Sequence, residues 1–172
     1  KSIFHTDGKI NFTQFKKITS LFDLKLDNLL DLKGTINLKT GIDLDLNKSF
    51  KFKNLSYLIE GNSKCFEIHT KKKKNIKKLF PDYNSKIIFK DTNVRINNSS
   101  LAQIGKFEGF IKLKDKFDSF KISEEYNFKK KKFNITGLID LTNSKILLSA
   151  LNYIKESKIK SDINFNVNFA LN

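Results

Sequence analysis

Apolar and polar residues alternate along much of this chain, most regularly in GTINLKTGIDLDL at residues 34–46. The apolar positions of that stretch share one parity: Ile36, Leu38, Ile42, Leu44 and Leu46. Successive side chains of a strand point to opposite faces, so a period of two predicts a strand with one buried and one solvated face. The same parity holds back to Leu24, which predicts two long strands joined tightly or one very long strand.

Further runs have the same character, and β-branched and aromatic residues dominate them, as is typical of strands. The predicted strands cover residues 49–61, 64–70, 86–97, 107–114, 120–128, 133–141 and 161–172. Within the run 120–128, Glu124 and Glu125 are adjacent, so an extended backbone would direct them to opposite faces. The tetralysine 129–132 between two of these runs predicts the tip of a hairpin.

A short repeat with the pattern G-x-I-x-[LF]-[KT] begins at Gly8, Gly34, Gly109 and Gly137. Such repeats indicate an array of similar supersecondary units. Each glycine shares the parity of the apolar residues that follow it, and is therefore predicted to lie on the apolar face. A missing side chain there would allow the sheet to bend. The alternative interpretation is that each glycine only marks the exit from a turn.

Three segments have helical spacing instead: residues 13–22, 71–80 and 145–156. Pro81 would end the second of them. The third follows Ser144, a suitable N-cap, and its apolar residues would form one stripe. The predicted fold is mainly β: a long, curved antiparallel sheet, a repeating β-groove, with two or three short helices. Residues 1–172 are expected to form a single segment of it.

Composition changes this prediction little but limits the function. The 172 residues are enough to bury a core. The formal net charge is +15, yet Arg95 is the only arginine. Lysine runs are typical of nucleic-acid contact, of attraction to anionic lipid headgroups, or of solvation and edge protection. Because arginine is the preferred reader of bases and phosphates, we expect no nucleic-acid partner.

Sequence motifs for enzymatic chemistry are absent. The chain contains no P-loop, G-x-G-x-x-G, G-x-S-x-G or H-E-x-x-H sequence. His5 and His69 have no ligand-spaced neighbours, and Cys65 has no second cysteine to pair with. We therefore expect a protein that is not an enzyme and has no cofactor or metal. The chain starts at Lys1 and contains no methionine, which we interpret as an internal piece of a longer protein.

The repeated G-x-I-x-L strands and the segment TGIDLDLNKSFKFKNLSYLIEGNSK resemble the AsmA-like proteins of Gram-negative bacterial envelopes. NIKKLFPDYNSKIIFKDTNVRI and SDINFNVNFAL are similar in character, and the likeness is best over residues 30–100 and 133–172. It depends on pattern and not on an invariant motif. The resemblance implies a periplasmic, groove-shaped β-sheet, anchored in the inner membrane by a part outside this chain. It also implies transport of phospholipid toward the outer membrane.

On this interpretation the chain is a non-enzymatic hydrophobic groove segment and its partner is phospholipid. Apolar side chains of one parity would line the groove and bind the lipid. These expected lipid-binding residues are Ile36, Leu38, Ile42, Leu44, Leu46, Ile111, Leu113, Ile139, Leu141, Phe165, Val167 and Phe169. An alternative function is a structural β-sandwich module of a surface protein, with a closed, dry core. A basic nucleic-acid-binding domain is a third possibility that the arginine content disfavours.

Overall fold

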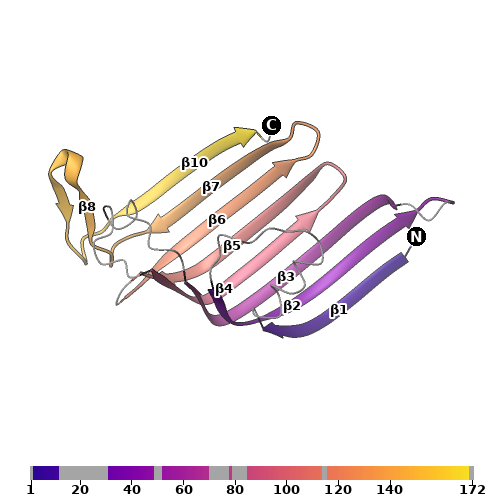
Figure 1. Cartoon of the computed structure of the whole chain (residues 1–172), viewed down its shortest axis with the longest axis horizontal. Coiled ribbons are helices and arrows are strands. Elements are labelled where there is room, and N and C mark those ends of the chain that lie inside the picture. Colours follow the sequence, from indigo (N-terminus) through magenta and orange to yellow (C-terminus); the bar gives the residue numbers. More distant parts are fainter. Residues whose placement is uncertain are drawn as a thin grey trace.

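The computed structural model describes residues 2–11, 31–48, 52–69, 78, 85–113 and 116–170. Eight strands form one antiparallel sheet in the order β1-β2-β3-β4-β5-β6-β7-β10, and two short strands form a separate hairpin (Figure 1). The strands of the large sheet are β1 (Ser2–Asn11), β2 (Asp31–Leu46), β3 (Phe52–His69), β4 (Lys86–Asn98), β5 (Ala102–Lys112), β6 (Phe117–Asn127), β7 (Lys132–Asp140) and β10 (Asp162–Ala170). The hairpin comprises β8 (Ile146–Leu148), the 3-10 turn η1 (Ser149–Leu151) and β9 (Tyr153–Lys155).

The prediction of a large antiparallel sheet is confirmed. Neighbouring strands pair antiparallel throughout, and β2 continues across the stretch 34–46 as one strand of 16 residues. The predicted hairpin tip is also confirmed, since residues 128–131 form the turn between β6 and β7. The helix predicted at 13–22 lies outside the described residues, as does the one predicted at 71–80 apart from Lys78.

The region predicted as two strands, 49–61 and 64–70, contains one strand, β3, with a change of parity inside it. Pairing between β2 and β3 shifts at a bulge between Gly34 and Asn37. On β3 the side chains of the apolar face are odd-numbered as far as Gly61 and even-numbered from Phe66 onward. The extra residue of a bulge moves the side chains beyond it to the opposite face of the strand. The alternation of apolar and polar residues is interrupted there, so the sequence pattern alone predicts two strands.

The helix predicted at 145–156 is wrong, because this segment forms the β8–β9 hairpin. Its turn ends at Asn152, which adopts a left-handed conformation. The Nζ atom of Lys155 donates to the carbonyl oxygens of Leu141 and Ser144, each at 2.6 Å. Only 1% of Lys155 is exposed, so this buried ammonium holds the hairpin against the end of β7.

The turn before the hairpin is tied to β6 by a buried carboxylate. Asp118 accepts hydrogen bonds from the backbone N–H of Asn143 and from the Ser144 hydroxyl, both at 2.7 Å. Ser144 therefore contacts β6 and does not cap a helix. These bonds satisfy a polar side chain that is otherwise shielded from water.

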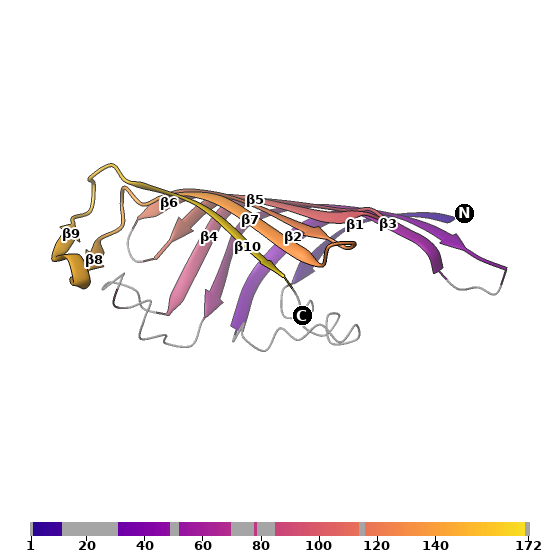
Figure 2. The same ribbon diagram turned by 90° about the horizontal axis from the view of Figure 1, so that it is seen from above.

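The large sheet is bent, and its strands curve toward one side (Figure 2). All four repeat glycines lie inside strands and on the apolar face, so the turn-exit interpretation is wrong. Gly34 has a φ of 128°, and a Cβ atom there would lie 2.8 Å from the Cα atom of Phe66. A Cβ on Gly109 would lie 2.9 Å from the Cα atom of Thr92, beside a second bulge in β4. Bulges and glycines thus occur together where neighbouring strands approach closely.

Candidate functional site

One face of the large sheet is mostly apolar, and its residues align in rows, three of which cross all eight strands. We call this whole face the apolar face. The first row is Phe4, Ile42, Tyr57, Asn98, Gln103, Tyr126, Phe133 and Phe169. The second is Thr6, Thr40, Ile59, Ile96, Gly105, Glu124, Ile135 and Val167. The third is Gly8, Leu38, Gly61, Val94, Phe107, Ile122, Gly137 and Phe165.

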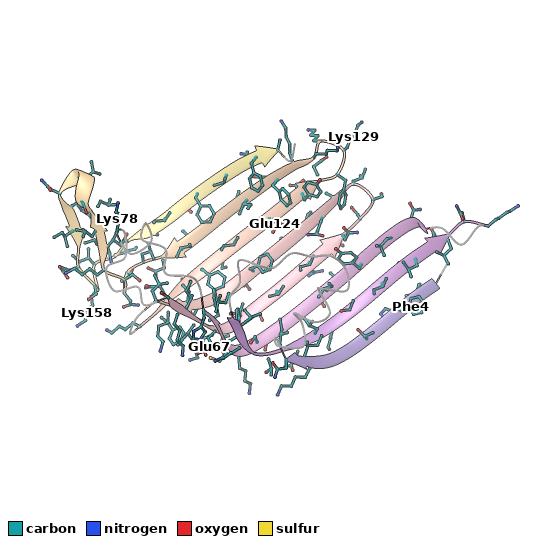
Figure 3. The ribbon with its side chains drawn as sticks, viewed as in Figure 1. Phe4, Glu67, Lys78, Glu124, Lys129 and Lys158 are labelled. Atoms are coloured by element: carbon teal, nitrogen blue, oxygen red, sulfur yellow. The ribbon has the colours of Figure 1, made fainter. Side chains whose placement is uncertain are left out.

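Beyond the third row, an aromatic cluster covers the part of the sheet near the bulges. The rings of Phe66 and Phe89 stack with their centroids 4.6 Å apart, and Phe120 meets Phe89 edge-on at 5.6 Å. A second cluster lies in the first row, where Phe133 stacks on Tyr126 at 4.4 Å and on Phe169 at 5.0 Å. Figure 3 shows the rings of the sheet standing on its near side. Figure 2 shows the strands curving toward that side, so the apolar face is the inner one.

Among the described residues, no second sheet packs on this face. Strands in extensive contact are always neighbours within a sheet. Apolar side chains on the outer strands remain exposed, at 52% for Phe4, 47% for Val167 and 43% for Phe169. Within the described residues, the large sheet is therefore a single layer.

Ten of the twelve expected lipid-binding residues belong to strands and share this inner face. Ile36 lies beside the third row and is almost buried, at 6% exposed. Leu113 and Leu141 lie just beyond the ends of β5 and β7, outside the paired strands. Leu141 is only 4% exposed, because the hairpin junction surrounds it. The ten strand residues are Ile36, Leu38, Ile42, Leu44, Leu46, Ile111, Ile139, Phe165, Val167 and Phe169.

The apolar face also contains polar side chains to which the sequence analysis gave no role. The Tyr57 hydroxyl donates to the Oε1 atom of Gln103 at 2.9 Å, joining β3 to β5 across β4. Burial raises the pKa of the Tyr57 hydroxyl. Asn98 lies between them in the first row and donates to the carbonyl oxygen of Leu55 at 3.2 Å. Glu124 stands in the second row, as the parity of the residues around it indicates.

The opposite face is largely polar and carries charges of both signs, and we call it the polar face. It also exposes apolar side chains, among them Ile104, Phe110 and Leu138. One of its rows is Asp7, Lys39, Glu60, Arg95, Lys106, Ser123, Thr136 and Asn166. Arg95 lies 3.6 Å from Glu60, and Lys121 lies 3.7 Å from Glu108. A shallow depression of about 470 Å³ lies among these side chains. Acidic side chains (Asp7, Glu60 and Glu108) and basic ones (Lys39, Arg95 and Lys106) both line it, so it presents no patch of one sign to a polyanion.

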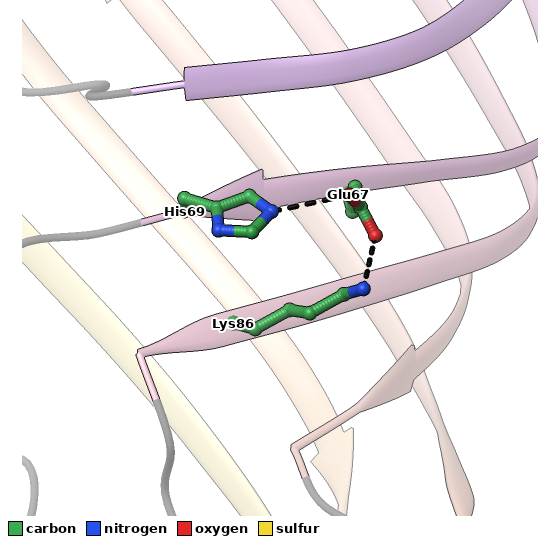
Figure 4. A network of polar contacts seen from close by, with 3 residues as sticks. All are labelled: Glu67, His69 and Lys86. Carbon is green, nitrogen blue, oxygen red and sulfur yellow. Dashed lines mark hydrogen bonds and ion pairs between the residues drawn. The ribbon is translucent and has the colours of Figure 1, made fainter.

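A small network lies at the end of the polar face where β3 meets β4 (Figure 4). Glu67 accepts from the Nζ atom of Lys86 at 2.5 Å and lies 3.1 Å from the Nε2 atom of His69. The hydrogen bond from Lys86, followed by the one from His69, lowers the pKa of the Glu67 carboxyl. All three side chains lie on the polar face, away from the apolar rows.

The described part of the chain offers no grouping of three histidine, cysteine or acidic side chains suited to holding a metal. It also contains no helix with the length and hydrophobicity that a membrane span requires. Comparisons with protein-family models, with curated proteins and with solved structures found no match.

Proposed function

We propose that the chain is a groove segment of an AsmA-like envelope protein and carries phospholipid between the inner and outer membranes without chemical catalysis. In this proposal it works in the periplasm, and parts outside this chain anchor the full protein in the inner membrane. The observation that carries the proposal is the apolar face: three rows that cross eight strands, with no second sheet packed on them among the described residues.

The driving force would be hydrophobic. Exposed apolar side chains such as Phe4, Val167 and Phe169 leave apolar surface in contact with water at both edges of the sheet. Burying one methylene group of a lipid tail against such a surface contributes about 0.8 kcal/mol. A diacyl lipid brings many methylene groups, so its tails are a better occupant than a small polar ligand.

The dimensions of the apolar face also suit lipid tails. Strands spaced by about 4.8 Å make a sheet of this width about 34 Å wide. A lipid tail extends about 15 Å, half the thickness of a bilayer's hydrocarbon core. A tail can therefore lie along a row and within the width of the sheet, whose strands curve toward this side (Figure 2).

Phosphate groups of the lipid would find lysines at one end of the sheet. The turn between β6 and β7 carries Lys129, Lys130 and Lys131, all exposed. Figure 3 places Lys129 at the tip of this turn. Attraction between lysine and an anionic surface is worth about 1 kcal/mol per residue and declines with added salt.

The direct test is native mass spectrometry of the purified chain after mixing with vesicles of labelled phospholipid. We expect bound diacyl phospholipid in the mass spectrum and transfer of label from vesicle to protein. Protein that remains lipid-free after this exposure would overturn the proposal.

A matched pair of variants on β10 makes the test specific to one face. Val167 lies on the apolar face, and Asn166 lies next to it on the polar face. Val167→Lys should reduce lipid capture severalfold, because an ammonium among the tails is costly to desolvate. Asn166→Lys adds the same charge to the same strand and should leave capture unchanged. Equal capture by both variants would show that lipid does not occupy the apolar face.

A further inference from the structure

Glu124 is an unusual residue on the apolar face because it is charged. The three rows contain no lysine or arginine, and Glu124 is their one carboxylate. Its side chain is half-buried between Gly105 on β5 and Ile135 on β7 (Figure 3). Neither a hydrogen bond nor an ion pair links it to another residue that the structure describes. The carboxylate therefore depends on water for its solvation.

The side chains beside Glu124 are suited to a cation. Tyr126 and Phe133 stand in the next row, with their rings stacked at 4.4 Å. Phe107 approaches from the other direction: a Cβ atom on Gly105 would lie 2.9 Å from the Phe107 ring and 3.9 Å from the Cβ atom of Glu124. Ring faces attract ammonium groups, so a carboxylate beside several rings forms a favourable environment for one.

Covering the apolar face with lipid tails would remove water from Glu124. An ionised carboxylate without a partner is strongly unfavourable in such surroundings, unless the covering molecule supplies a cation or hydrogen-bond donors. An ammonium group supplies both, and a charge-assisted hydrogen bond is stronger than a neutral one. A lipid with an anionic headgroup and no amine supplies no cation, and at most hydroxyl groups as donors.

We propose that Glu124, with the rings of Phe107, Tyr126 and Phe133, forms a subsite for the primary ammonium of an aminophospholipid headgroup. This inference depends on the proposed function, since it names the class of lipid that the apolar face selects. Phospholipids with and without an amine both carry a negatively charged phosphate. The subsite therefore distinguishes lipids by the amine and not by the phosphate.

The test uses the whole chain with vesicles that contain phosphatidylethanolamine and phosphatidylglycerol of identical acyl chains in equal amounts. Native mass spectrometry gives the ratio of the two lipids bound. We expect the unmodified chain to favour the amine lipid about tenfold, the effect of one charge-assisted hydrogen bond. Glu124→Gln should bring the ratio close to one, because the amide carries no charge. Glu124→Lys should reverse the preference.

The control is Glu125→Gln, which removes the neighbouring carboxylate from the polar face. The lipid ratio should be unchanged in this variant. Equal binding of the two lipids by the unmodified chain, or a preference that survives in Glu124→Gln, would overturn the subsite and leave the lipid-carrying function standing. Absence of any bound lipid would instead overturn the proposed function, so the two failures are distinguishable.

Discussion

At the scale of single residues, glycine positions determine how closely neighbouring strands can approach on the apolar face. Gly34 combines a φ of 128° with a close approach to the backbone of Phe66. Gly8 also belongs to the apolar face, yet nothing lies within 4 Å of a Cβ atom added there. The shared repeat pattern therefore contains glycines with different physical roles.

Gly34→Ala should lower the free energy of unfolding by about 2 kcal/mol or more, because alanine is strained at this φ and its Cβ meets backbone atoms. Gly8→Ala should change it by less than about 0.5 kcal/mol. Chemical denaturation of the two variants measures both effects. Similar losses in both would contradict a special role for the bulge.

The contribution of the Glu67 network on the polar face to stability can be tested by varying the pH. Hydrogen bonds from Lys86 and His69 lower the pKa of its carboxyl in the folded state. A lowered folded-state pKa stabilises the protein above the unfolded value of about 4.3, and this contribution disappears as the pH falls through the folded value. Glu67→Gln should therefore destabilise the chain by up to about 1 kcal/mol at pH 6.

The difference between Glu67→Gln and the unmodified chain should shrink steadily below about pH 4. Thermal or denaturant unfolding across a pH series measures this. A difference that stays constant down to the lowest pH at which the protein folds would mean that the carboxylate charge contributes nothing to stability.

At the scale of elements, the strands were predictable and the hairpin was not. A period of two repeats over many residues in β2 and β10, and no competing period fits those stretches. Residues 145–156 have apolar residues at helical spacing, but the segment is short and its local pattern does not decide its structure. The decisive interactions there are tertiary: the Lys155 ammonium with carbonyls outside the hairpin, and Asp118 with the preceding turn. No local pattern reveals them.

The alternation also predicts which side chains of a strand share a face. For this reason the expected lipid-binding residues within the strands lie on one face of the sheet. The bulges could not be predicted, because a single extra residue reverses the phase without any change in composition. The polar members of the apolar face were also missed. Glu124 has the parity of the apolar residues around it, but a charged residue is not expected on an apolar face. Only the strand pairing places it there.

Lys155 holds the hairpin, so its removal should loosen that element alone. Lys155→Met leaves the carbonyls of Leu141 and Ser144 without their buried donor, and unsatisfied buried acceptors are costly. Hydrogen exchange over residues 141–161 should accelerate at least tenfold, with β3 to β6 unaffected. Lys160→Met removes an exposed lysine from the same region and should leave exchange unchanged. Uniform acceleration throughout the sheet would contradict this local role.

At the scale of the whole molecule, a single sheet layer leaves stability dependent on whatever covers its inner face. A ligand that binds only the folded state adds about 2.7 kcal/mol at a hundred times its dissociation constant. For a chain of this size that corresponds to a rise in melting temperature of about 5–10 °C. Dispersed diacyl phospholipid should produce such a rise.

Glycerol phosphate provides the control for this measurement, because it carries the charge of a phospholipid without its tails. It should leave the melting temperature unchanged in a scan by differential fluorimetry or calorimetry. A rise with glycerol phosphate equal to that with phospholipid would assign the stabilisation to the lysines and not to the apolar face.

The continuity of the rows has a consequence for movement. Each row passes from β1 to β10 without a gap, so a tail displaced sideways by one strand meets a surface much like the one it left. A lipid tail held in this way would meet only small energy barriers between neighbouring strands and would diffuse along the rows. In the proposed function, Glu124 is the one carboxylate in these three rows, so an amine headgroup would be retained longest there.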